Sequence, residues 1–140
     1  MEEIFVSSSR SVFLFRDDET KLFRIQLTDR IVHADYKTTC ERLLEGIIAT
    51  GYRRVMFDLS KQVHDEAISR AWFASVFLPQ VIRKVGFGIH AAVVLPGNTV
   101  QKILLEMLIG TTRALGFKNV NCFTQAEEAD RWLTATDPKP

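Results

Sequence analysis

The fold is decided by the stretch Asn119-Val120-Asn121-Cys122-Phe123-Thr124-Gln125-Ala126-Glu127-Glu128-Ala129-Asp130-Arg131-Trp132-Leu133, which is typical of a short strand that leads directly into a helix. Thr124 and Glu127 have the spacing of a capping box, in which a hydroxyl and a carboxylate each bind a backbone N–H at the helix start. Such a cap stabilises a helix by about 1 kcal/mol. Small and apolar residues then recur at helical spacing (Ala126, Ala129, Leu133), which predicts a helix packed on a sheet.

The composition predicts one compact domain. The chain has 140 residues, of which 46% are hydrophobic, enough for a sizeable core over 1–136. The polar, proline-rich residues 137–140 are expected to form a flexible tail. Eighteen basic residues are dispersed among seventeen acidic ones, so the net charge is +1 and no nucleic-acid footprint is indicated.

The beginning of the chain favours a cytoplasmic location. Met1-Glu2-Glu3 is acidic where a secretory signal would be basic, and no apolar run is long enough to cross a bilayer. We therefore expect no integral membrane segment. Cys40 and Cys122 lack metal-site spacing and are expected to be buried free thiols.

Upstream of the deciding stretch, the first half of the chain predicts a hairpin and a helix. Runs at 4–6, 12–15 and 22–27 are typical of strands, and the polar residues 16–21 favour an antiparallel hairpin between the second and third. A helix follows, with Asp35 as its expected cap, Gly51 as its left-handed stop, and apolar residues at helical spacing (Tyr36, Cys40, Leu43, Leu44, Ile47, Ile48).

The middle of the chain alternates between buried strands and helices. Strands are predicted at 55–59 and 89–95. The helix between them is expected to begin near Asp65 and to be kinked or ended by Pro79. A third helix follows the turn 96–98 and ends at Gly116. Its expected core face comprises Val100, Ile103, Leu104, Met107, Leu108, Thr111 and Leu115.

The complete order is βββαβαβαβα, which predicts an α/β fold with a mixed sheet, an N-terminal antiparallel hairpin, a parallel core and packed helices. At this level the chain resembles the STAS superfamily, specifically small bacterial proteins like the anti-sigma-factor antagonists, some of them described as similar to CRAL-TRIO lipid-binding domains. The residues that carry the resemblance are Phe57-Asp58-Leu59-Ser60, Ala92-Val93-Val94-Leu95-Pro96 and 123–133.

The resemblance implies a phosphorylated serine at the start of the second helix, where a partner kinase acts on the antagonists. Here Asp65 matches the helix-start aspartate only approximately, and Glu66 or Ala67 stands where the serine is expected. Glutamate would place a fixed negative charge at that point. Ser69 is a displaced candidate inside the predicted helix. We therefore expect a domain that lacks the usual phosphoacceptor.

Candidate binding residues follow the carboxyl ends of the predicted strands, where open α/β sheets bind ligands. These residues are Asp58, Ser60, Pro96, Gly97, Asn98 and Thr124. The structural alternative, which we favour, is that they cap helices and turn the chain. The three histidines lack metal-pair spacing, and no nucleophile elbow is present, so we expect no metal, no cofactor and no enzyme activity.

The densest apolar cluster is 72–78. The favoured interpretation places Trp72 and Val76 in the core, with Phe73 and Phe77 covered by the segment at Pro79. Alternatively, Phe73 and Phe77 form a homodimer patch or line a pocket. Two functional hypotheses result: a non-enzymatic regulatory module that contacts an unidentified protein through the second helix and residues 58–66, and a carrier of a small apolar or lipid-like ligand between that helix and the sheet.

Overall fold

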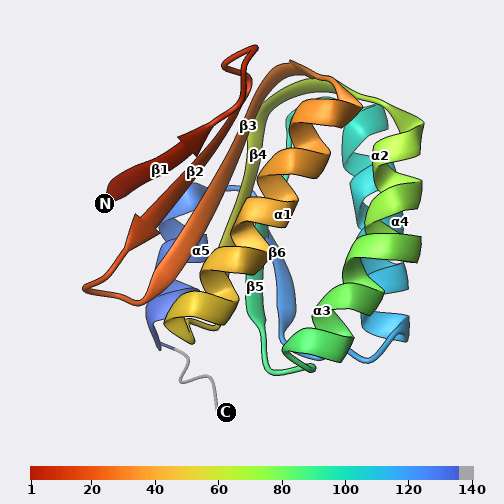
Figure 1. The fold of residues 1–140 in the computed structure, drawn as a ribbon. Coiled ribbons are helices and arrows are strands. Elements are labelled where there is room, and N and C mark those ends of the chain that lie inside the picture. Colours follow the sequence, from red (N-terminus) through yellow and green to blue (C-terminus); the bar gives the residue numbers. More distant parts are fainter. Residues whose placement is uncertain (136–140) are drawn as a thin grey trace.

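The computed structural model describes residues 1–135, so the expected tail at 137–140 lies outside the described residues. Its centre is a six-stranded sheet in the order β1-β2-β3-β4-β5-β6 (Figure 1). Pairing is antiparallel from β1 to β3 and parallel from β3 to β6, which confirms the predicted mixed sheet and its hairpin. The strands are β1 Glu2–Val6, β2 Val12–Asp17, β3 Leu22–Ile31, β4 Arg54–Asp65, β5 His90–Val94 and β6 Val120–Phe123.

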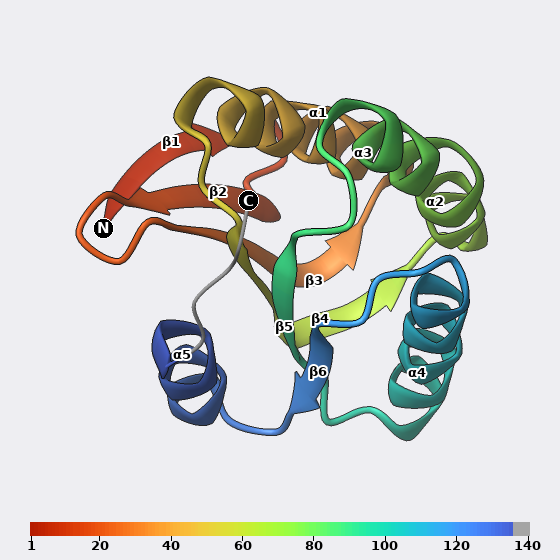
Figure 2. The same cartoon turned by 90° about the horizontal axis from the view of Figure 1, so that it is seen from below.

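The helices divide between the two faces of the sheet. They are α1 His33–Thr50, α2 Ala67–Trp72, the π-helical segment η1 Phe73–Phe77, α3 Leu78–Lys84, α4 Thr99–Ala114 and α5 Ala126–Ala135. Figure 2 shows α5 apart from the layer that contains α1, α2 and α3. Within residues 1–135, no helix combines the length and apolar character needed to span a bilayer.

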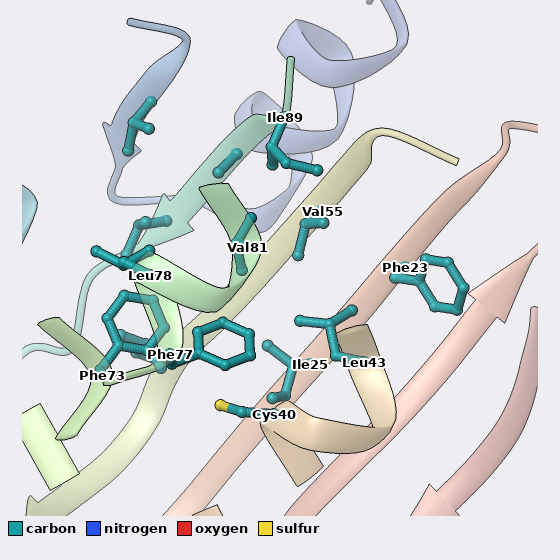
Figure 3. Packing of buried hydrophobic residues seen from close by; sticks show 14 of the residues in the cluster. Phe23, Ile25, Cys40, Leu43, Val55, Phe73, Phe77, Leu78, Val81 and Ile89 are labelled. Atoms are coloured by element: carbon teal, nitrogen blue, oxygen red, sulfur yellow. The ribbon is translucent and has the colours of Figure 1, made fainter. Parts of the chain in front are cut away.

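Each face has its own core. The larger cluster contains residues of the strands from β2 through β6 and of the helices α1, η1, α3 and α4. Figure 3 shows part of its packing. The smaller cluster lies under α5 and comprises Leu22, Met56, Ala92, Val94, Ala129 and Leu133. The alternation of side chains along β4 and β5 supplies both clusters, because successive residues point to opposite faces.

The deciding stretch forms the predicted strand and helix, but the expected cap is wrong. The first hydrogen bond of α5 joins the Ala129 N–H to the Gln125 carbonyl at 3.2 Å, so Gln125, rather than Thr124, precedes the helix. Similarly, α1 begins at His33 with Val32 before it, which places Asp35 in the first turn. Gly51 is left-handed (φ 78°) and ends α1 as predicted.

Strand β4 is much longer than predicted and ends at Asp65, the residue near which the second helix is expected to begin. Pairing with β3 continues as far as Ile31 opposite Asp65, so the backbone of 60–65 is held as a strand. Helix α2 therefore starts at Ala67. Sequence periodicity missed the extension because residues 60–65 are mostly polar.

Pro79 does not end the second helix, because a π-helical turn precedes it. The Leu78 N–H binds the Phe73 carbonyl, five residues back, and α3 then continues to Lys84. The widened turn makes room for the proline ring, which would clash with the preceding carbonyl in a regular helix.

The widened turn also changes which residues face the core. Phe73 and Phe77 are buried, Trp72 is half-buried, and Val76 and Ile68 are exposed. The expectation that Val76 enters the core is therefore wrong. Burial of both phenylalanines also removes them from the surface, so the predicted homodimer patch cannot form there.

Helix α4 presents a different face from the predicted one. Its buried residues are Gln101, Leu105, Ile109 and Thr112, while Val100, Ile103 and Met107 are exposed. The buried side-chain hydrogen bond from Gln62 to Gln101 (2.8 Å) explains the orientation, since it holds a polar residue inward. Periodicity alone counts apolar residues and therefore selected the wrong side.

Two glycines test the packing of the helices. In Gly46→Ala the new Cβ would lie 2.8 Å from Cζ of the buried Phe23 ring. We expect a loss of about 1–2 kcal/mol in unfolding free energy, despite the better helix propensity of alanine. The matched control is Gly110→Ala in α4, where nothing lies within 4 Å. Its stability should rise by about 0.5–1 kcal/mol. Urea unfolding measures both, and equal effects would contradict the packing described for α1.

Candidate functional site

A cavity of about 100 Å³ lies between the larger core face of the sheet and the helices that cover it. Its wall includes side chains from β4 and β5, from η1 and α3, and from α1 and α4. Almost all of these side chains are apolar. Phe73 and Phe77 line it, so the structure supports the predicted position of a pocket between the second helix and the sheet.

Aromatic rings shape one wall of the cavity. Phe57 meets Phe73 edge to face with ring centroids 6.0 Å apart, and Phe73 lies 5.2 Å from Phe77. Figure 3 shows Phe73 and Phe77 side by side near Leu78. Ala91 lies on the wall formed by β5, where its small side chain leaves room. The rings are thus fixed by their mutual contacts, and the short Ala91 side chain fills little of the wall on the β5 side.

Polar groups gather at one place on the wall, and two bulges in β4 put them there. Gln26 of β3 pairs with Asp58 of β4, and Thr28 pairs with Lys61, so β4 has one more residue than β3 between these two pairs. The second bulge adds one more β4 residue between Gln62 and His64. The bulges break the period of two. Val55, Phe57 and Leu59 enter the cavity at the regular spacing of two, and the bulges then bring in Gln62 and Asp65 at a spacing of three.

Asp65 is the centre of this polar group. It is buried, forms an ion pair with Arg70, and lies beside Gln101, which itself binds Gln62. Burial raises the pKa of the Asp65 carboxyl, and Arg70 and His64 offset only part of that effect. The polar group therefore contains one buried carboxylate, one cation and two amides.

Tyr36 extends the polar group toward α1. Its side chain lines the cavity, and its hydroxyl contacts the Cys40 thiol. Burial raises the pKa of Tyr36, and Cys40 and Asp65 add to the rise. Burial also raises the pKa of the Cys40 thiol, so the sulfur is a neutral packing group.

Asp58 and Ser60 lie away from the cavity. Asp58 forms an ion pair with Arg24 and accepts hydrogen bonds from the Ser60 N–H (3.1 Å) and hydroxyl (2.6 Å). Burial alone would raise the pKa of the Asp58 carboxyl, but the hydrogen bonds from Ser60 and the Arg24 guanidinium together lower it. These contacts satisfy the carboxylate and support the structural interpretation of this pair.

The remaining predicted site residues have local partners or lie at turns. Glu66 precedes α2, and Ser69 is only 1% exposed with its hydroxyl 3.0 Å from Nδ1 of His33. Asn98 caps α4 by accepting the Gln101 N–H at 3.1 Å, and Gly97 is an exposed turn residue. In residues 1–135, no three His, Cys, Asp or Glu side chains are grouped to hold a metal ion.

Of the predicted site residues, the cavity brings together Asp65, Phe73 and Phe77. No sequence pattern singled out Gln62, Arg70 or Tyr36 as cavity residues. Tyr36 was assigned to a core face, and Arg70 lies five residues beyond Asp65, but their meeting depends on the β4 extension. The bulges that turn Gln62 inward have no recognisable sequence signal.

Substitution of two adjacent alanines on opposite faces of β5 tests whether the cavity has room for additional side-chain atoms. Ala91 lines it, whereas Ala92 is fully buried under α5. In Ala91→Val the added methyl groups should fill empty space and raise the unfolding free energy by about 1 kcal/mol. In Ala92→Val they should overpack the smaller cluster and lower it by about 1–3 kcal/mol. The two variants gain the same strand propensity, so the difference between their unfolding free energies in urea reports the difference in packing. Destabilisation of both variants would show that no such space exists.

The ion pair of Asp58 with Arg24 predicts that the stability of the protein depends on pH. Because its pKa is lowered on folding, the carboxylate contributes stability at neutral pH that is lost as the pH falls through the folded pKa. Asp58→Asn should therefore lower stability by about 1–3 kcal/mol at pH 7, and the difference from wild type should shrink in acid. Urea unfolding at several pH values measures it. A constant difference would contradict the assigned pairing.

Comparison with known proteins identifies the fold. No protein-family model matches the sequence, and no curated protein matches it. Solved structures do match. The anti-sigma factor antagonist SpoIIAA in its unphosphorylated form is 10% identical, with a TM-score of 0.61 over 89% of this chain and 99% of that one. An anti-sigma factor antagonist from Mycobacterium paratuberculosis is 14% identical, with a TM-score of 0.57 over 91% and 98%.

A third match is an uncharacterized protein of the DUF3478 family, described as having a SpoIIAA-like fold, from Shewanella loihica PV-4. It is 13% identical, with a TM-score of 0.56 over 87% of this chain and 91% of that chain. At these identities the matches establish the fold and not the activity. The chain has the SpoIIAA-like fold, which confirms the fold predicted from its resemblance to STAS domains.

Proposed function

We propose that this protein is a non-enzymatic domain that binds a small, largely apolar molecule in the cavity beneath η1 and α4. The single observation that carries the proposal is the cavity itself, about 100 Å³ in volume, with an apolar wall and one localised polar group. This arrangement, an apolar pocket with few convergent polar groups, is the usual form of a small-molecule site.

A cavity of this volume, if left unfilled, substantially lowers the stability of a domain of this size. At about 24 cal/mol per Å³, a volume of about 100 Å³ lowers stability by about 2 kcal/mol. That is a sizeable part of the 5–15 kcal/mol that typically holds a domain together. A bound molecule would recover the lost contacts, which supports a binding role.

The volume limits the size of the ligand. A cavity of about 150 Å³ holds benzene, so one of about 100 Å³ accommodates about four to five non-hydrogen atoms. This favours a small molecule over the acyl chain of a lipid. The carrier hypothesis is therefore retained for a compact ligand.

Native mass spectrometry of protein released gently from its source cells tests the proposal. We expect one added mass on the wild-type protein and a reduced fraction of loaded protein in Ala91→Val, which narrows the cavity. Met107→Gln, an exposed position on α4, is the control and should retain the added mass. Unloaded wild-type protein, together with no response of the cavity methyl groups to xenon in NMR spectra, would refute the proposal.

A second candidate function is protein interaction through α4. Val100, Ile103 and Met107, here named the α4 stripe, are 65%, 53% and 66% exposed. They lie at helical spacing on one side of α4, and so much exposed apolar surface on one helix is typical of a contact site. Two proteins that share the fold are anti-sigma factor antagonists, whose name describes action through another protein. We propose that the α4 stripe binds the apolar surface of a partner protein.

Interaction by this route would not use the phosphorylation switch of the antagonists. Glu66 and Ala67 occupy the start of α2, and the hydroxyl of Ser69 is buried against His33. A kinase could not reach that hydroxyl without opening the helix. Burial of Ser69 therefore supports a module without a phosphoacceptor at this point.

Site-specific photo-crosslinking tests the second candidate. A photoreactive residue introduced at Met107 should give one discrete crosslinked species in the source cell, and the same residue at the exposed Glu128 of α5 should not. The mass of the product distinguishes a second copy of the chain from a different protein. No product at position 107, or equal products at both positions, would contradict a specific contact at the α4 stripe.

A further inference from the structure

We propose that the cavity selects an uncharged molecule with a compact polar head, such as a primary amide, over an anion or a cation of the same shape. This inference rests on the proposed function and specifies the chemical class of its ligand. It depends on the charge balance of the polar group on the cavity wall.

The first observation is that the charges on the wall cancel. Among the described residues that line the cavity, Asp65 and Arg70 are the charged ones, and they form an ion pair with each other. Their side chains are only 7% and 20% exposed, so solvent screens the pair poorly. A ligand with a net charge would bring an uncompensated charge into an apolar space.

The second observation is that uncharged groups surround this pair. Gln62 and Gln101 are joined by a buried hydrogen bond, Gln101 also lies beside Asp65, and Tyr36 lines the same cavity. Amide and hydroxyl groups both donate and accept hydrogen bonds. Of these residues Gln62 and Tyr36 line the cavity, and a primary amide matches them because it also offers both functions without charge.

The behaviour of Asp65 supports the same conclusion. Burial raises the pKa of its carboxyl even though Arg70 is its direct partner. The surroundings therefore disfavour a negative charge that already has a cation beside it. A second anion would find less compensation than Asp65 does.

Three probes of nearly identical shape test the inference: propanamide, propanoate and propanamidinium. They differ in charge, and each has about five non-hydrogen atoms, the size that the cavity accommodates. NMR titration of the cavity methyl groups at pH 7 gives the three dissociation constants. We expect wild-type protein to bind propanamide at least about tenfold more tightly than either ion, because an unpaired buried charge is strongly disfavoured.

Single substitutions should change which of the three probes binds most tightly. Asp65→Asn leaves the Arg70 cation without its anion, so propanoate should become the tightest probe. Arg70→Gln removes the cation beside Asp65, so propanamidinium, which can take its place next to that carboxyl group, should gain the most. Asp58→Asn is the matched control, since it breaks an ion pair away from the cavity and should preserve the wild-type order.

The outcomes separate the inference from the function on which it rests. Tighter binding of either ion than of propanamide by wild-type protein, or equal binding of all three, would refute selection by charge but leave ligand binding intact. If wild-type protein binds none of the probes, the inference fails, and the response of the cavity methyl groups to xenon decides whether the proposed function fails with it. Circular dichroism verifies folding of each variant, and the wild-type comparison remains decisive if a variant does not fold.

Discussion

The parallel pairing of β3 with β4 is the constraint on which the rest of the structure depends. It continues from Leu22 opposite Arg54 to Ile31 opposite Asp65, with two bulges on the β4 side. The pairing extends β4 beyond its apolar half, delays the start of α2 to Ala67 and turns Gln62 inward. Gln62 then holds Gln101, which sets the orientation of α4. One ladder of backbone hydrogen bonds thus positions two helices and the polar group of the cavity.

The two faces of the sheet are packed differently. Under α5, small and apolar side chains meet tightly, and Ala92 and Ala129 are completely buried. On the opposite face, longer helices span a wider space, aromatic rings contact one another, and a cavity remains. An ion pair is present on each face, but only the pair of Asp65 and Arg70 adjoins that cavity. The molecule therefore has one densely packed face and one face that contains a cavity.

Sequence patterns identified some features that depend on nearby residues and missed those that distant segments decide. Asn98 could be recognised as a cap because the cap lies within three residues of its partner. Phe73 and Phe77 were recognised as candidates for a pocket by their apolar density. The orientation of α4 could not be predicted, because apolar residues occur on more than one side of that helix and a residue of β4 selects among them.

The sequence by itself determined the order of strands and helices, the antiparallel hairpin and the left-handed stop at Gly51, since these depend on periodicity and on conformational preferences over a few residues. Tertiary structure alone decided the length of β4, the π-helical turn before Pro79 and the meeting of Asp65 with Arg70, Gln101 and Tyr36. These features depend on hydrogen bonds and packing between segments far apart in the chain. Local preference is weak beside such contacts, and so the sequence predicted the fold and two residues of the cavity wall but not the polar group in that wall.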